Sequence, residues 1–177
     1  MENLHTALER VGHAILRAVI RASRPQDDDV AVSRVWSDGV STLRAMRYPW
    51  PPPSGWESEP HDLVGADTIV AGAHCDNGTG ISMMVWQSHD GLQVERPAAS
   101  GEGSTWLDVP AVDGGLSIHV GKGLEIQTGG LLQATRHRVL ATARQPRSSI
   151  GLFFCPHPVR SVAAPTRYMT RPAIPST

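Results

Sequence analysis

Apolar positions follow a helical spacing near the start of the chain and a strand-like spacing further on. Between residues 3 and 22 they return every three or four residues, with arginine and glutamate between them. This pattern predicts one amphipathic helix, which we expect to pack on the back of a sheet rather than on a membrane. Arg24-Pro25 and the acids at 27–29 end it, because proline disfavours helix continuation and adjacent acids repel one another.

From Val30 onward, short apolar runs alternate with glycine, aspartate and proline, which is typical of an all-β sandwich or barrel. The proline-rich tract at 49–53 cannot donate backbone hydrogen bonds, so it predicts a surface loop that runs to about His61. We expect strands at residues 40–47, 67–74, 80–87, 92–95, 105–109, 116–120, 123–127, 135–142 and 148–155.

This number of short strands fits a mainly β fold, a double-stranded β-helix or jelly roll with one N-terminal amphipathic helix. The chain then divides into a helix and linker at 1–29, a jelly-roll core at 30–160 and a C-terminal tail at 161–177. The length of 177 residues leaves room for one such core.

Composition excludes several classes of protein. A formal net charge of −1 gives no reason to expect a nucleic-acid partner. No apolar run approaches the ~18 residues of a membrane span, and the N-terminus lacks the pattern of a signal peptide. Two cysteines do not make a disulfide framework. We therefore expect a cytoplasmic protein with no membrane and no nucleic-acid partner.

Three residues form a candidate metal site. Alternate side chains of a strand share a face, so His74 and Asp76 point the same way and Cys75 points to the opposite side. His137, 61 positions after Asp76 (137 − 76), would complete a 2-His-1-carboxylate set that leaves three corners of an octahedron open. Open corners indicate catalysis at a metal, and this donor set favours Fe(II). The alternative is a buried, hydrogen-bonded histidine and a turn aspartate.

Arg147 and Ser149 are also two residues apart, and hence lie on one face of one strand. A guanidinium binds a carboxylate through two parallel hydrogen bonds, and a hydroxyl beside it adds one donor. An unpaired arginine buried among apolar neighbours would be costly, so we expect an anionic partner. The alternative is a surface arginine at the start of a strand.

The order of these motifs resembles the isopenicillin N synthase-like branch of the Fe(II)/2-oxoglutarate-dependent dioxygenases. In that family His-x-Asp, a downstream His-Arg-Val (here 137–139) and Arg-x-Ser recur in this order, and the segments at 43–49, 91–94 and 106–110 also look like the family's. The resemblance covers roughly residues 40–158. It implies a jelly-roll catalytic core in which His74, Asp76 and His137 hold Fe(II).

The same resemblance implies that Arg147, Ser149 and Tyr48 bind 2-oxoglutarate as cosubstrate. It further implies that O2 is consumed, that succinate and CO2 are released, and that an unactivated C–H bond of a small metabolite is hydroxylated, desaturated or used for ring closure. The iron centre itself is then the catalytic group, with no separate acid or base. Tailoring in secondary metabolism is the commonest role in this branch.

The chain departs from the family pattern at several positions. Met46 stands where relatives often have asparagine, which removes one polar contact near the metal-chelating end of 2-oxoglutarate. Lys122 replaces an acid in the Asn-x-Gly-Asp turn, and His119, at the asparagine position, either projects toward the site or has a structural role in the turn. Because Asp76 supplies a carboxylate, halogenation is disfavoured. Relatives carry a longer N-terminal region, so we expect either an open site for a small metabolite or closure by a second subunit in a homodimer.

Three other functions stay open at this point. The Arg-x-Ser pair binds the substrate's own carboxylate in isopenicillin N synthase, an oxidase without 2-oxoglutarate. A non-catalytic metal-binding jelly-roll module and a Zn(II) hydrolase or isomerase on a cupin-like barrel are the others. Among the remaining cysteine, histidine and aromatic side chains, we expect Cys75 to lie in the core, three histidines to lie on the surface, and four aromatic residues to lie in the core or in a pocket wall. These histidines are His61, His89 and His157, and the aromatic residues are Trp86, Trp106, Phe153 and Phe154.

Overall fold

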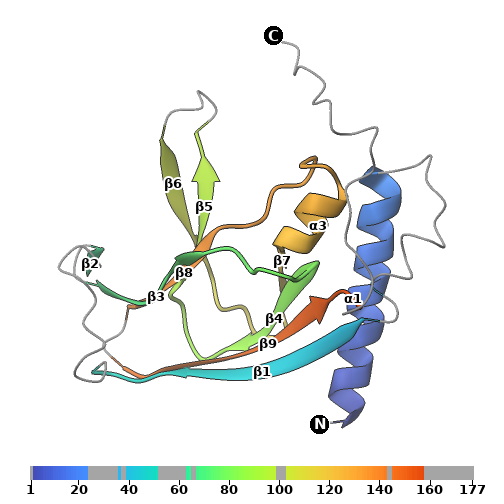
Figure 1. Ribbon diagram of the computed structural model, residues 1–177. Coiled ribbons are helices and arrows are strands. Elements are labelled where there is room, and N and C mark those ends of the chain that lie inside the picture. Colours follow the sequence, from blue (N-terminus) through green and yellow to red (C-terminus); the bar gives the residue numbers. More distant parts are fainter. Residues whose placement is uncertain are drawn as a thin grey trace.

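The computed structural model consists of one long helix and two antiparallel sheets (Figure 1). It describes residues 2–23, 36, 39–51, 63–64, 67–98, 103–142 and 145–157. The elements in chain order are α1 (Glu2–Ser23), β1 (Val40–Tyr48), β2 (Leu63–Val64), β3 (Asp67–His74), β4 (Ile81–Gln87), β5 (Leu92–Pro97), β6 (Ser104–Val109), β7 (Ser117–Val120), α3 (Lys122–Gln127), β8 (His137–Ala141) and β9 (Arg147–Cys155).

The strands that pair are often far apart in the sequence. One sheet has four strands in the order β1-β9-β4-β7, and the other has five in the order β2-β3-β8-β5-β6. Thus β1 pairs with β9 near the end of the chain, and β3 pairs with β8. The predicted mainly β architecture is confirmed, and the long-range pairing brings distant motifs together.

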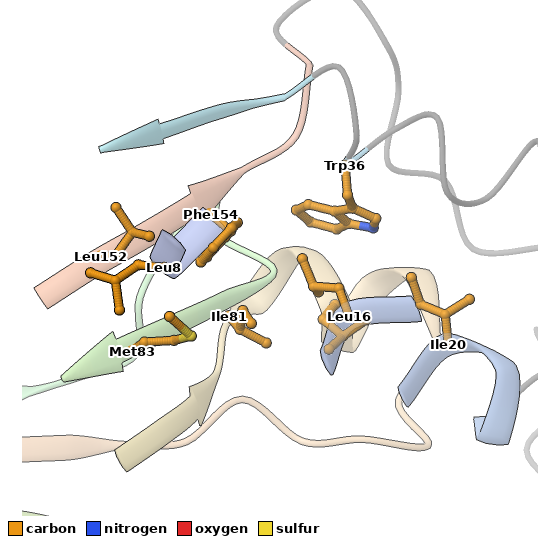
Figure 2. Close-up of a cluster of buried hydrophobic side chains, with 9 residues drawn as sticks. Leu8, Leu16, Ile20, Trp36, Ile81, Met83, Leu152 and Phe154 are labelled. Atoms are coloured by element: carbon orange, nitrogen blue, oxygen red, sulfur yellow. The ribbon is translucent and has the colours of Figure 1, made fainter. Parts of the chain in front are cut away.

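Helix α1 covers the outer face of the four-stranded sheet, as its amphipathic pattern predicts. Leu16 and Ile20 pack with Ile81 of β4 and Phe154 of β9 in one buried cluster (Figure 2). Burying a leucine or isoleucine side chain contributes about 1.5–3 kcal/mol, so the cluster ties the helix to the sheet. Strand alternation leaves the opposite face of β4 and β9 free for the other side chains.

One expected strand is wrong. Residues 122–127 form helix α3, which begins after Gly121, whose carbonyl accepts the N–H four residues on at 3.1 Å. Leu124 and Gln127, three apart, are buried, whereas Ile126, which a strand would place on the same face as Leu124, is 49% exposed. The apolar alternation of this segment resembles a strand, but the side chains that are buried follow a helical spacing.

The other expected strands have counterparts in the structure, with ends that differ by a few residues, while the short strand β2 has no counterpart in the sequence prediction. The expected linker at 24–29, most of the proline-rich loop and the tail at 161–177 lie outside the described residues. The division into three parts therefore stays a prediction. In the part of the chain that the structure describes, no helix has the length and apolar character needed to cross a membrane.

Candidate metal centre and its cavity

His74, Asp76 and His137 converge on one point. His74 ends β3 and His137 begins β8, and the antiparallel register places them directly opposite each other. One ligand atom from each of the three residues lies within 4.8 Å of the others. The Nε2 atoms of His74 and His137 each lie 3.9 Å from Oδ1 of Asp76. Two imidazoles and a carboxylate in this arrangement could hold a metal ion.

Backbone carbonyls fix both imidazole rings. Nδ1 of His74 lies 2.7 Å from the carbonyl oxygen of Gly72, and Nδ1 of His137 lies 3.0 Å from that of Thr135. A carbonyl can only accept, so each Nδ1 carries the proton and donates it, which leaves the Nε2 lone pair free toward Asp76. Metal-ligating histidines are held in this way.

A turn and a neighbouring strand position Asp76. Its backbone carbonyl accepts a hydrogen bond from the N–H of Lys122 at 3.0 Å and from the hydroxyl of Thr79 at 3.2 Å. Its Oδ2 accepts a hydrogen bond from Ser82 of β4 at 2.5 Å. The side chain of Lys122 pairs with Glu125 at 2.6 Å, so the residue that departs from the family pattern contributes its backbone to this turn.

The three residues open onto a cavity of about 120 Å³ that also reaches the predicted cosubstrate residues. It is lined by Arg44, Met46, Tyr48, His74, Asp76, Ser82, Met84, Leu92, His119, His137, Val139, Arg147, Ser149 and Phe153. The sequence therefore correctly predicted that the His-x-Asp, His-Arg-Val and Arg-x-Ser segments lie together.

Arg147 is 2% exposed, so the alternative of a surface arginine is wrong. Its Nη2 donates to Oε1 of Gln87, and its Nε donates to the carbonyl of His89 at 3.3 Å. Burial lowers the pKa of the Arg147 guanidinium, and the nearby Tyr48 and Asp90 oppose this change. Among the described residues, no carboxylate lies within ion-pair distance of Arg147. Its positive charge therefore faces the cavity with neutral partners.

Tyr48 and Ser149 lie beside this guanidinium. The guanidinium carbon of Arg147 is 5.7 Å from the centroid of the Tyr48 ring, and the two residues are partners in the β1–β9 register. Burial raises the pKa of the Tyr48 hydroxyl, which therefore stays protonated at neutral pH. Ser149 is buried and pairs with Met46, whose thioether occupies the position where an amide is common in relatives.

His119 lines the cavity as well, and it is 4% exposed. Its ring centroid lies 5.3 Å from that of His137, and its Nε2 lies 3.4 Å from the hydroxyl of Ser117. Its buried Nδ1 has no hydrogen-bond partner among the described residues. Burial, with a smaller contribution from His137, lowers the pKa of His119 to about 4, so the ring is neutral. Of the two roles that the sequence left open, the structure shows this side chain at the site.

A β-bulge brings in Gln87, which sequence reasoning missed. Regular alternation from Met83 would turn Gln87 toward the helix-covered face of the sheet. The register of β4 against β9 shifts between Met84 and Trp86, so Gln87 lies opposite Ser149 on the cavity side. Ser82 was also missed, although a small polar residue inside the apolar run of β4 was a detectable signal.

Several other expectations can now be compared with the structure. Cys75 is half-buried, with its thiol 3.8 Å from the carbonyl of Ala134. His89 is half-buried, not on the surface as expected, because its carbonyl contacts Arg147 and its Nε2 is enclosed. His157 is also half-buried, and His61 lies outside the described residues.

Three of the four aromatic side chains lie in the core or in a pocket wall, whereas Trp106 is half-buried, with the guanidinium carbon of Arg138 4.0 Å from its ring centroid. Phe153 lines the cavity and Phe154 lies in the core, as predicted. Trp86 is 47% exposed and lines a wider apolar hollow of about 290 Å³ with Val109 and Leu116. This hollow has no titratable side chain in its lining, so the smaller cavity is the candidate site.

The five-stranded sheet and the turn after β3 bring two imidazoles and one carboxylate to one point, which is the donor set of 2-His-1-carboxylate metal proteins. A family model described as the 2OG-Fe(II) oxygenase superfamily matches residues 41–156. The chain belongs to this superfamily, which confirms the resemblance and with it the family's Fe(II) and 2-oxoglutarate.

Two plant enzymes and one fungal structure illustrate the relationship. The chain is 35% identical to feruloyl CoA ortho-hydroxylase 1 of Arabidopsis thaliana over 98 residues, which cover 55% of this chain and 26% of that protein. It is 33% identical to gibberellin 2-beta-dioxygenase 1 of Pisum sativum over 103 residues, 58% of this chain and 29% of that protein. These matches span between a quarter and a third of each curated relative.

The fungal structure is a full-length protein of Neurospora crassa, solved in complex with alpha-KG. It superposes with a TM-score of 0.72 at 21% identity, over 95% of this chain and 49% of that one. At this identity the likeness concerns the fold, and it confirms the predicted double-stranded β-helix.

Proposed function

We propose that this chain is the catalytic core of an Fe(II)- and 2-oxoglutarate-dependent oxygenase that hydroxylates an unactivated C–H bond of a small molecule. The observation that carries the proposal is the single cavity that joins the His74, Asp76 and His137 cluster to the buried guanidinium of Arg147. A dianionic keto acid fits such a cavity, with its keto-acid end at the metal-binding triad and its other carboxylate at the guanidinium.

The donor set fits Fe(II). Two imidazoles on the paired strands β3 and β8, with one carboxylate in the turn after β3, match the facial triad of non-haem Fe(II) oxygenases. The Ser82 hydroxyl donates a hydrogen bond to Oδ2 of Asp76, so that Oδ1 faces the Nε2 atoms of the two histidines. When bound, Fe(II) would supply the open positions at which 2-oxoglutarate chelates and O2 is reduced.

At the other end of the cavity, Arg147 and the Ser149 hydroxyl would bind the distal carboxylate of 2-oxoglutarate. Arg147 has a planar fork that suits a carboxylate, and Gln87 and the His89 carbonyl hold the guanidinium in place. Tyr48 stays protonated and can donate a further hydrogen bond. Burial of these groups excludes water, which strengthens their hold on an anion.

In the overall reaction 2-oxoglutarate, O2 and the substrate R–H give succinate, CO2 and R–OH, with one oxygen atom of O2 in succinate and the other in the alcohol. Desaturation or ring closure are variants set by how the substrate lies. The relatives' names refer to feruloyl CoA and gibberellin, which supports a small organic substrate, as in secondary metabolism. A homodimer and a cytoplasmic location stay predictions.

The test is succinate formation by the protein reconstituted with Fe(II), ascorbate and 2-oxoglutarate under air. We expect the wild-type protein to produce succinate, Asp76→Ala to produce none, and the exposed-turn control Asp113→Ala to match the wild type. O2 consumption without succinate would instead indicate an oxidase that does not use 2-oxoglutarate. Iron binding with neither O2 consumption nor succinate would indicate a non-catalytic module.

A further inference from the structure

The cavity is lined by two arginines, and the proposed function uses only one of them. Arg44 lies on β1 and, by strand alternation, shares the cavity face with Met46 and Tyr48. Its guanidinium carbon lies 4.7 Å from the centroid of the Phe153 ring, which also lines the cavity. The side chain as a whole is exposed. Arg44 therefore presents a charge at the solvent-accessible edge of the cavity.

Arg44 and Arg147 occupy different places. The guanidinium of Arg147 lies over Tyr48, its partner in the register, whereas that of Arg44 lies over Phe153. Phe153 follows Arg147 by six positions (153 − 147), so the two guanidinium groups lie over different parts of β9.

Arg44 instead lies toward the metal end of the cavity. Phe153, on which its guanidinium rests, is the register partner of Ser82 on β4. The Ser82 hydroxyl donates to Asp76 of the candidate triad. The positive charge of Arg44 is thus near the position where a substrate would have to present a C–H bond to a bound metal.

This charge has no counter-ion among the described residues. No carboxylate there lies within ion-pair distance of Arg44, whereas Arg136, also exposed, pairs with Glu95 at 2.8 Å. The one carboxylate in the cavity lining belongs to Asp76, which is engaged by Ser82 and the two imidazoles. A guanidinium stacked on an aromatic ring keeps its N–H donors free along the edge of its plane, where a carboxylate binds.

We propose that Arg44 binds a carboxylate group of the substrate, so that the substrate class is a small carboxylic acid. The proposal rests on the proposed function, because it concerns a second ligand bound beside 2-oxoglutarate. Arg44 is then a residue that determines specificity: it orients the acid so that carbon atoms near the carboxylate lie next to the metal centre.

The test measures binding separately from turnover. The protein is loaded anaerobically with Mn(II) and saturating 2-oxoglutarate and titrated calorimetrically with octanoate, 3-phenylpropanoate and 2-naphthoate, each beside its methyl ester. We expect at least one acid to bind ten-fold or more tightly than its ester. In Arg44→Gln this preference should disappear, while the affinity for 2-oxoglutarate is unchanged. Arg44→Lys should retain part of the preference, because it keeps the charge and loses the fork.

The matched control is Arg47→Gln, an exposed arginine of the same strand on the opposite face, which should bind like the wild type. Equal binding of acid and ester by the wild-type protein, or an unchanged preference in Arg44→Gln, would overturn the proposal for Arg44. A wild-type protein that does not bind 2-oxoglutarate would overturn the proposed function itself, so the two failures are distinguishable.

Discussion

Gly12 is predicted to be a position where alanine destabilises a helix. In the middle of a helix alanine is normally more stable than glycine by about 1 kcal/mol. A Cβ at Gly12, however, would overlap Cζ and Cε2 of Phe154 and lie 2.8 Å from Cε1. Phe154 is 2% exposed and packs in the cluster that contains Leu16 and Trp36. Its ring therefore cannot move away without disturbing that cluster.

The two effects can be weighed against each other. Overpacking of a well-packed core typically costs about 1–3 kcal/mol, which exceeds the gain in helix propensity. Because the new Cβ would overlap more than one ring atom, the upper end of that range applies, and the net loss of unfolding free energy in Gly12→Ala is about 2 kcal/mol. For a chain of this length that corresponds to a fall in Tm of about 4–8 °C.

The assay is urea and thermal unfolding of the metal-free protein, followed by circular dichroism. Ala18→Gly, at an exposed position of the same helix, measures the propensity difference alone and should cost about 1 kcal/mol. In a Phe154→Leu background Gly12→Ala should cost less than in the wild type, because the overlapping ring atoms are absent. A Gly12→Ala protein as stable as the wild type, or more stable, would refute the reasoning about how α1 packs.

Three further predictions concern the site. Ser82→Ala should weaken metal binding by about 10–100-fold, because Asp76 loses the hydrogen bond that orients it; calorimetric titration with Mn(II) measures this, and unchanged affinity would contradict it. Gly91→Ala should lower the unfolding free energy by several kcal/mol, well above the ~1 kcal/mol typical of point mutants, and urea unfolding tests this. The reason is that Gly91 has a φ of 130° and that an added Cβ would overlap the carbonyl of Leu140. The pKa of His119 is lowered to about 4 in the folded protein, so below about pH 6.5 the unfolded chain binds more protons than the folded one. The unfolding free energy of the metal-free protein should therefore fall by up to about 3 kcal/mol between pH 6.5 and 4. His119→Asn should flatten this dependence of unfolding free energy on pH, and the same dependence in the variant and the wild type would contradict the assignment.

Much of the fold and site could be predicted because the signals are local. The period of apolar residues identified α1 and most strands, and the spacing of two placed Arg147 and Ser149 on one face of β9. His74 and Asp76 also line the cavity together, but Asp76 lies in the turn after β3 and not within the strand. The pairing of His74 with His137 depends on long-range topology. Here the resemblance to a family supplied what periodicity does not.

The misses come from tertiary contacts. The segment of α3 alternates like a strand, but it forms a helical turn in which Gly121 and Gly123 pack closely on Thr79, with no room for a Cβ at either position. Gln87 reaches Arg147 because of a β-bulge, and a bulge leaves no periodic signal in the sequence. That Nδ1 of His119 has no hydrogen-bond partner among the described residues is likewise a property of the assembled cavity.

The central claim is that one cavity binds Fe(II) and 2-oxoglutarate with Arg147 as the anchor of the distal carboxylate. The most direct measurement is an anaerobic titration of the Fe(II)-loaded protein with 2-oxoglutarate, followed by the visible charge-transfer absorption of the chelate. We predict this absorption in the wild-type protein and in the exposed control Arg96→Ala, with 2-oxoglutarate affinity about 30-fold or more weaker in Arg147→Ala, since loss of a buried charged partner costs about 2–5 kcal/mol. Absorption that titrates identically in Arg147→Ala, or no absorption in a wild-type protein that holds iron, would contradict the account.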